Sequence, residues 1–304
     1  MSIAMKLRRV FEDPPPEFIF ELSEAGIAWA RRAKTLRTGF EPLPADIVSV
    51  SPTRDNVLQP DKLAAAIARL AAPLSSQKKR RPAALILPDY CGRVAVLDFD
   101  TFPSEPREQH SLVRFRVKKS VPFDLDAASV SFHVQPHPTG GKRRDVVVAV
   151  VSLEILARYE APLRAAGLHP GFVTLSALSA LHLLQGGRLE VMAKLSGNVL
   201  SVAVVENGAL RMYRCVGLEQ VMPADLMDVL FPTFAYVEDE LKRRPDCLLL
   251  CGFGAFGDQV AGDFQSELGT PVEAVRSLYG PPGPVDAGML GYLQSLGLEL
   301  GAAA

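Results

Sequence analysis

Apolar and polar positions alternate in two separate parts of the chain in a pattern that predicts β-hairpins. Residues 18–32 form an apolar strand, a short polar turn and a second apolar strand. Residues 190–216 form three such strands, with a turn at residues 196–198 and an Asn207-Gly208 turn. Asn-Gly between apolar runs is a strong hairpin signal. The chain therefore looks like two related halves, although two short hairpins can also resemble each other by chance.

The segment between these hairpins predicts a compact subdomain over residues 83–167. Two β-rich runs joined by Pro88, Asp89 and Gly92 are expected to form a further hairpin. A helix should follow Pro103, because Ser, Glu and Pro at its start are typical of a helix N-terminus. The expected elements, in chain order, are strands 83–87 and 93–99, helix 105–120, strands 129–135 and 145–152, and helix 153–166. Their order is β-β-α-β-β-α.

Charge and hydropathy exclude several classes of protein. Lys and Arg number 33 against 34 Asp and Glu, a net charge of -1, which argues against a nucleic-acid-binding protein. The longest aliphatic run, Val146–Val151, is far shorter than the roughly 18 apolar residues of a membrane-spanning helix. The first ten residues lack the apolar core of a secretory signal. We expect a cytoplasmic protein.

The residue types that bind metals or attack substrates are scattered along the chain. Cys247 and Cys251 are the closest pair among four cysteines, and paired CxxC spacing is absent. His133 and His137 are four residues apart, but they fall where a strand meets two prolines. The sequence holds no P-loop and no Gly-x-Ser-x-Gly motif. We therefore expect no metal site and no catalytic residues.

Near the C-terminal end, an apolar strand over residues 246–251 leads into Gly252-Phe253-Gly254 and then an amphipathic helix. Glycines between a strand and a helix suit close approach to a phosphate. No acidic residue on a following strand completes a dinucleotide site. A tight turn without a ligand is an equally good interpretation.

The two hairpin halves, the inserted subdomain and this late strand-Gly-x-Gly-helix segment together resemble the actin-like ATPase superfamily. Within it, the chain resembles the PilM family of cytoplasmic type IV pilus assembly proteins, with relatives in type II secretion and competence machines. The resemblance spans about residues 17–300. It is carried, in chain order, by Leu97–Pro103, Val121–Asp124, Val130–Val134, Ala165–Leu168, Tyr213-Arg214 and Asp286–Gly291.

This resemblance implies an α/β protein with an actin-like, ribonuclease H-like two-domain fold and an inserted subdomain. The implied division is a tail at 1–17, a first actin-like subdomain at 18–82, the insertion at 83–167, a connecting helix at 168–189, and a truncated second domain at 190–304. The second domain is called truncated because only about thirty residues separate Arg214 from the strand at Asp246.

The chain departs from the family at both phosphate-binding hairpins, which read Asp-hydrophobic-Gly in that family. Here they read Glu21-Leu22-Ser23 and Lys194-Leu195-Ser196. Aspartates at such sites organise magnesium and the attacking water, and glycines let backbone N–H groups approach phosphate. Glu21 could still reach a metal, whereas Lys194 could only contact a phosphate as a point charge. The resemblance thus implies a degenerate nucleotide cleft formed by Glu21, Ser23, Lys194, Ser196, Gly197, Gly252 and Gly254.

These changes predict a protein without ATP hydrolysis and without a resident cofactor, with Mg-ATP as the possible ligand. The alternative is a nucleotide-binding actin-like ATPase or a small-molecule kinase. That alternative needs an acidic base in the cleft, and Glu21 is its candidate. Asp89, Asp98 and Asp100 are expected in the inserted subdomain, far from the cleft.

The resemblance implies a scaffold that holds the N-terminal cytoplasmic tail of a PilN-like inner-membrane protein, in a groove between the first subdomain and the insertion. The groove residues would be Arg114, Lys118, Val121, Pro122 and Phe123, although ordinary packing under a helix end explains the last three equally well. A basic helix face with Arg107, Arg114, Arg116 and Lys118 could also meet anionic lipid or an acidic partner, or be merely solvated. We expect a location peripheral to the inner membrane. The sequence leaves the oligomeric state and the particular machine open.

Overall fold

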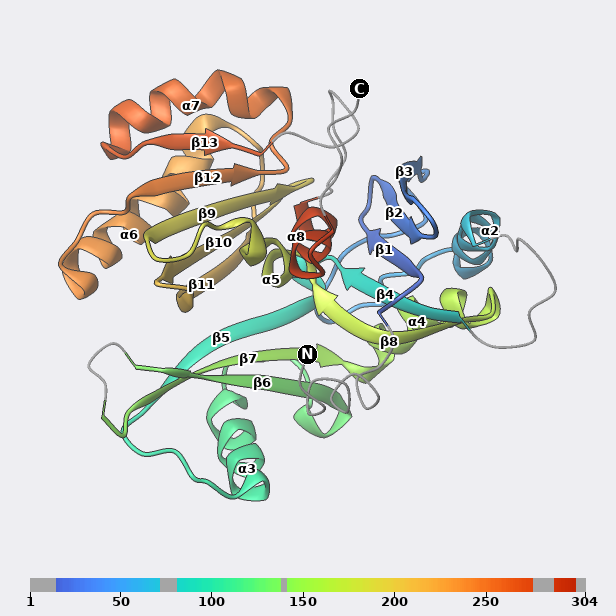
Figure 1. The fold of residues 1–304 in the computed structure, drawn as a ribbon, viewed down its shortest axis with the longest axis horizontal. Coiled ribbons are helices and arrows are strands. Elements are labelled where there is room, and N and C mark those ends of the chain that lie inside the picture. Colours follow the sequence, from blue (N-terminus) through green and yellow to red (C-terminus); the bar gives the residue numbers. More distant parts are fainter. Residues whose placement is uncertain (1–14, 72–80, 138–140, 276–286, 299–304) are drawn as a thin grey trace.

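The computed structural model describes residues 15–71, 81–137, 141–275 and 287–298, and its elements form two large sheets and one small one (Figure 1). The first large sheet has the strand order β3-β2-β1-β4-β8. Its strands are β1 (Phe18–Leu22), β2 (Gly26–Arg32), β3 (Leu36–Pro42), β4 (Arg81–Leu87) and β8 (Leu168–Leu175). Helices α2 (Pro60–Leu70) and α4 (Leu153–Ala165) pack together on one face and bury its larger apolar core.

The second large sheet repeats this arrangement with the strand order β11-β10-β9-β12-β13. Its strands are β9 (Leu189–Ser196), β10 (Val199–Glu206), β11 (Ala209–Gly217), β12 (Cys247–Cys251) and β13 (Val272–Ala274). Helices α6 (Pro223–Leu241) and α7 (Ala255–Leu268) share a core with one of its faces. In each sheet, three antiparallel strands are followed by two parallel ones. The expectation of two related halves is confirmed.

The small sheet has the order β5-β7-β6 and carries helix α3 (Pro106–Val117) on one face. Its strands are β5 (Gly92–Phe99), β6 (Ala128–Pro136) and β7 (Arg144–Ser152). Two further short helices, η1 (Asp89–Cys91) and η2 (Leu125–Ala127), flank it. The inserted sheet lies against the second large sheet, because Leu210 N donates a hydrogen bond to Gln135 Oε1 at 3.2 Å and Arg211 pairs with Asp145 at 2.8 Å.

The predicted hairpin between residues 83–87 and 93–99 is wrong. Strand β4 runs parallel to β1 and β8 in the first large sheet, whereas β5 pairs with β7. Five consecutive residues of β4 are buried, as expected for a strand covered on both faces, and such an apolar run carries no signal about its partner. The predicted element order holds, but the separate sheet spans 92–152 rather than 83–167.

The connecting helix predicted at 168–189 is also wrong. This segment is the edge strand β8, followed by the short helices α5 (Ser176–Ala180) and η3 (Leu181–Leu183). Helix α5 packs against α8 (Ala287–Ser295), and the two lie between the large sheets (Figure 1). None of the helices in the described ranges is long and apolar enough to span a bilayer.

Candidate functional site

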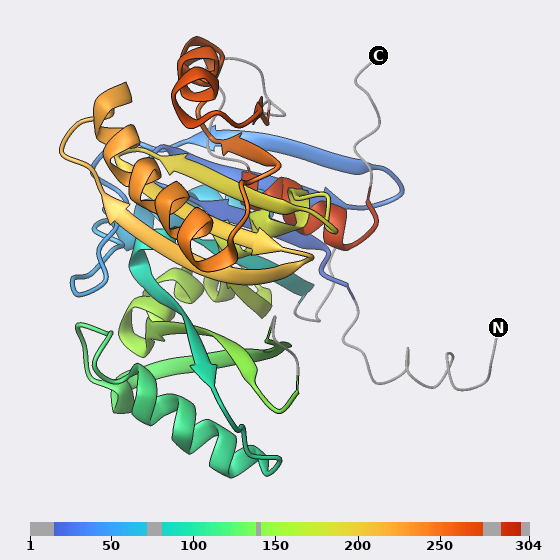
Figure 2. The ribbon, with the colours of Figure 1, turned by 90° about the vertical axis from the view of Figure 1, so that its left-hand side faces the viewer.

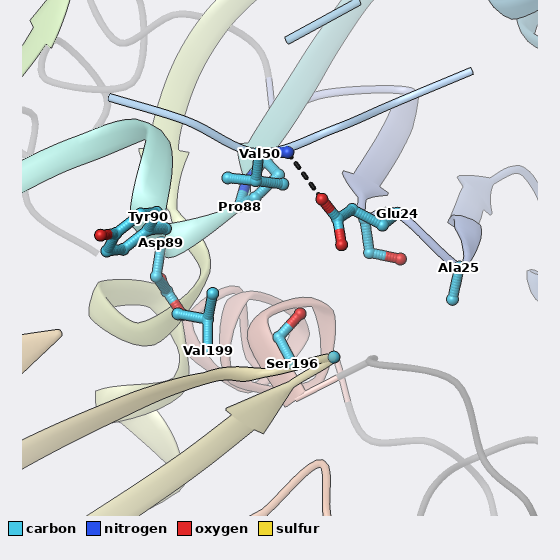
Figure 3. A pocket seen from close by; sticks show the side chains of 10 residues that line it. Glu24, Ala25, Val50, Pro88, Asp89, Tyr90, Ser196 and Val199 are labelled. Atoms are coloured by element: carbon cyan, nitrogen blue, oxygen red, sulfur yellow. Dashed lines mark hydrogen bonds between the residues drawn. The ribbon is translucent and has the colours of Figure 1, made fainter. Parts of the chain in front are cut away.

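The two altered hairpins meet between the large sheets. Glu21 lies on β1 and Lys194 at the corresponding place on β9, and each residue is only 1% exposed. The turns after these strands face each other across a small cavity, with Glu24 on one side and Ser196 on the other (Figure 3). The structure therefore brings Glu21, Ser23, Lys194, Ser196 and Gly197 together.

Lys194 is bound by an acid that the sequence analysis placed elsewhere. Its Nζ lies 2.9 Å from Asp89 Oδ2, and both side chains are 1% exposed. Asp89 Oδ1 accepts a hydrogen bond from Ala177 N at 2.6 Å. The expectation that Asp89 lies far from the cleft is wrong, because β4 belongs to the first large sheet and delivers Asp89 to the cleft at its carboxyl end. The ion pair joins the two halves of the molecule.

The charges around Lys194 keep it protonated. Burial by itself lowers the pKa of a lysine, because it disfavours the ammonium form. The negative charges of Asp89 and Glu21, together with the hydrogen bond to Asp89, outweigh burial and raise the pKa of Lys194 above its usual value. Lys194 is thus a buried cation held by carboxylates, and its ammonium is not presented to solvent.

Both carboxylate oxygens of Glu21 are bound by the protein. Oε1 accepts a hydrogen bond from Ser176 Oγ, and Oε2 accepts one from Met289 N at 2.7 Å. Met289 is in the first turn of α8, where backbone N–H groups have no partner within the helix and favour a negative charge. Glu21 therefore anchors the start of α8.

The space left between the hairpins is small. The cavity has a volume of about 50 Å³, whereas pockets for small-molecule ligands usually have about 300–1,000 Å³. Its wall is fixed at one point by Val50 N, which donates to Glu24 Oε1 at 2.7 Å (Figure 3). The lining residues are Ser23, Glu24, Ala25, Val50, Pro88, Asp89, Tyr90, Ser196, Gly197 and Val199. By volume this cavity suits a few water molecules.

The Gly252-Phe253-Gly254 turn is explained by backbone packing. Gly252 has φ +73°, and a Cβ there would lie 2.2 Å from Leu195 O. Gly254 also has a positive φ, +54°, and precedes the first residue of α7. Phe253 is buried in the core of the second large sheet. Close approach of this turn to β9 is sufficient reason for glycine at residue 252.

The structure groups the five predicted partner-binding residues at the C-terminal end of α3 and in the loop that follows. Arg114 pairs with Asp126 at 2.8 Å and donates to Leu125 O, so it holds this loop in place. Val121 and Phe123 pack against the inserted core. The other two predicted residues, Lys118 and Pro122, are exposed.

The predicted basic helix face is only partly available for binding. Arg114 pairs with Asp126, while Arg116 stacks on Phe99 and lies 3.9 Å from Asp98. Arg107 forms no ion pair with any described residue. Asp98 and Asp100 lie in the inserted subdomain, as predicted, and both contact Arg143.

The four cysteines are free thiols. The pKa of Cys215 is raised to about 12 and that of Cys247 to about 11, and burial is the main cause of both shifts. Such thiols stay protonated near neutral pH and are poor nucleophiles. Within the described ranges, no three His, Cys, Asp or Glu residues are grouped to hold a metal ion.

Comparisons with solved structures identify the fold. A chain of a PilM-PilN type IV pilus biogenesis complex superposes with a TM-score of 0.69 at 18% identity, covering 94% of this chain and 100% of that one. A Bacteroides thetaiotaomicron protein with an actin-like ATPase fold and unknown function gives 0.55 at 11% identity, covering 91% and 95%. The cytoplasmic domain of EpsL, an inner-membrane component of the Vibrio cholerae type II secretion system, gives 0.51 at 15% identity, covering 91% and 94%.

The likeness is one of structure, since no protein-family model and no curated protein sequence matches the chain. The similar structures extend over more than nine-tenths of this chain and include a protein described by its actin-like ATPase fold. The duplicated sheets and the helices between them agree with that architecture. The chain has the actin-like ATPase fold predicted from its sequence.

Proposed function

We propose that this protein is a cytoplasmic scaffold of an inner-membrane assembly that builds type IV pili, or of a related secretion or competence machine, and that it works without hydrolysing ATP. The observation that carries the proposal is the Lys194–Asp89 ion pair, because the resemblance implies that Lys194 stands where the family has a magnesium-organising aspartate. Glu21, the candidate base of the alternative ATPase or kinase, is tied to Ser176 and to α8. The similarity to a chain of a type IV pilus biogenesis complex, and to the cytoplasmic domain of an inner-membrane component of a type II secretion system, supports the same role.

The residues of the cleft are poorly suited to Mg-ATP. A magnesium ion would compete with the ammonium of Lys194 for Asp89, and like charges disfavour that arrangement. The cavity of about 50 Å³ is also too small for a nucleotide in this conformation. In the proposed function, the ion pair between Lys194 and Asp89 links the two halves of the molecule. A bound nucleotide would otherwise link them.

We propose that the partner is the N-terminal cytoplasmic tail of a PilN-like membrane protein, bound beside the loop that follows α3. This loop leads into β6, whose first residue, Ala128, pairs with Ser152 immediately before α4. The loop therefore borders the first domain. Leu153, the first residue of α4, follows the partner of Ala128, is 48% exposed and offers an apolar anchor at this junction. A short tail can bind such a junction through apolar anchors and backbone pairing.

The tail proposal is tested with the full chain and a labelled synthetic peptide of the N-terminal cytoplasmic residues of the PilN-like protein encoded in the same genome. We expect saturable binding by fluorescence anisotropy. Leu153→Glu should weaken it at least about tenfold, because a charge replaces an apolar anchor worth about 1.5 kcal/mol or more. Leu58→Glu is the matched control, since Leu58 is similarly exposed at 53% but lies before α2. Absence of saturable binding, or equal loss in both variants, would contradict the proposed site.

A further inference from the structure

Cations gather at one end of the first large sheet, the end opposite the cleft. Strand β2 ends there with Arg31 and Arg32, the turn to β3 carries Lys34, and Arg37 is the second residue of β3. Arg81 begins β4, which lies two strands from β2 in the same sheet, and it reaches the same end. We refer to these five cations as the basic end.

The inner part of the basic end is held in place by one acid and one ring. The carboxylate of Glu17 lies 3.3 Å from Arg31 and 3.6 Å from Arg81. Both guanidinium groups also lie over the ring of Phe18, 5.1 Å and 4.6 Å from its centroid. Two cations therefore share a single negative charge.

The outer cations are not neutralised. Lys34 and Arg37 are exposed and Arg32 is half-buried, and within the described ranges none of these three forms an ion pair. Arg37 lies directly opposite Arg31 across the β2–β3 pairing, and like charges in that position destabilise a sheet. Five cations and the one acid, Glu17, give this end a net charge of +4, whereas the whole chain has -1. A negative surface outside the molecule would relieve this repulsion.

An exposed aromatic pair borders the basic end on the side of α8. Phe172 of β8 is 45% exposed and stacks on Tyr292 of α8, with 5.0 Å between ring centroids. Burial raises the pKa of Tyr292, and the positive charge of nearby Arg32 partly offsets that rise. In Figure 2 the blue β2–β3 turn points to the right, next to the red helix α8. Aromatic rings beside cations are typical of surfaces that meet the polar region of a bilayer.

We propose that the basic end docks on an anionic lipid surface. The cations are spread over three strands and a turn, across about 14 Å from β3 to β4, so a flat and diffusely charged surface can contact them together. A single carboxylate or phosphate could reach only one or two of them. This contact goes beyond the proposed tail binding and does not depend on it. The basic end also lies apart from α3, which is at the bottom of the molecule in Figure 2.

Cosedimentation of the full chain with phosphatidylcholine vesicles, with and without added phosphatidylglycerol, tests the proposal at low salt. We expect binding to the vesicles that contain phosphatidylglycerol, little binding to phosphatidylcholine alone, and release when salt screens the charges. Lys34→Gln combined with Arg37→Gln should weaken binding at least about tenfold, because each cation near an anionic surface contributes about fivefold in affinity. Both side chains are exposed and unpaired, so the variant should keep the thermal midpoint of the wild type.

The matched control is Arg107→Gln combined with Lys119→Gln. It also removes one exposed arginine and one exposed lysine, here from α3 and the turn that follows it, and it should bind like the wild type. Wild-type protein that binds both kinds of vesicle equally, or neither, would overturn the proposal. Equal losses in the two variants would also overturn it, since net charge alone would then explain binding. Loss of binding in the control variant alone would overturn it too, and would place the lipid surface on α3.

Discussion

Replacing Asp89 by alanine is expected to lower the free energy of unfolding by about 3–5 kcal/mol. The substitution leaves the buried ammonium of Lys194 without its ion-pair partner at 2.9 Å. It also removes the acceptor of the Ala177 N–H, which is 2.6 Å from the carboxylate. Breaking one side of a buried ion pair is costly because the remaining charge stays desolvated. Urea denaturation followed by circular dichroism measures the loss.

Two further variants separate the buried charge from general damage. Lys194→Met added to Asp89→Ala should recover much of the loss, because it removes the charge that was left unpaired. Asp98→Ala is the control, since Asp98 is a largely exposed acid whose contacts with Arg116 and Arg143 are near the surface. It should change stability by less than about 1 kcal/mol. Equal effects of Asp89→Ala and Asp98→Ala would show that the cleft is not held by this pair.

Substituting Gly291 by alanine is expected to destabilise the protein by about 1–3 kcal/mol, although alanine is the better helix former. A Cβ at Gly291 would lie 2.1 Å from Ser179 O, so α8 and α5 can approach only with glycine at this position. Displacing α8 would also expose Met289 and Leu293, which are fully buried, and would break the contact of Met289 N with Glu21. Chemical denaturation again provides the measurement.

The matched control for this substitution is Gly262→Ala in α7. Gly262 is also helical, but a Cβ there would meet nothing within 4 Å. Alanine at residue 262 should therefore stabilise the protein by up to about 1 kcal/mol. If both alanine variants were stabilising, the close contact between α5 and α8 would not exist in solution.

Much of the fold could be predicted because its hairpins and amphipathic helices carry local signals. The polar turn after β1, the turn at residues 196–198 and the Asn207-Gly208 turn placed five of the strands, and the repeated hairpins indicated two halves. Parallel pairing has no such local signal. The partners of β4 are β1 and β8, each more than fifty residues away, and an apolar run alone cannot identify them.

Because the pairing of β4 with β1 was not predicted, Asp89 was not assigned to the cleft. Glu21 and Lys194 were found because they stand at the altered hairpins, but Asp89 was assigned to the insertion along with β4. Pairing β4 with β1 would have placed Asp89 at the carboxyl end of a parallel strand, beside Glu21. The contacts of Ser176 and Met289 with Glu21 join residues more than 150 positions apart, and no local sequence pattern predicts them.

The central claim, that side chains of the protein take the place of a nucleotide, is tested most directly by thermal unfolding of the full chain with and without millimolar Mg-ATP. A ligand that binds only the folded state at a hundredfold excess over its dissociation constant stabilises it by about 2.7 kcal/mol. The account predicts an unchanged midpoint in the wild-type protein. A rise of several degrees with Mg-ATP, absent with magnesium alone, would show that the Lys194–Asp89 pair opens to admit a nucleotide, and would contradict the account.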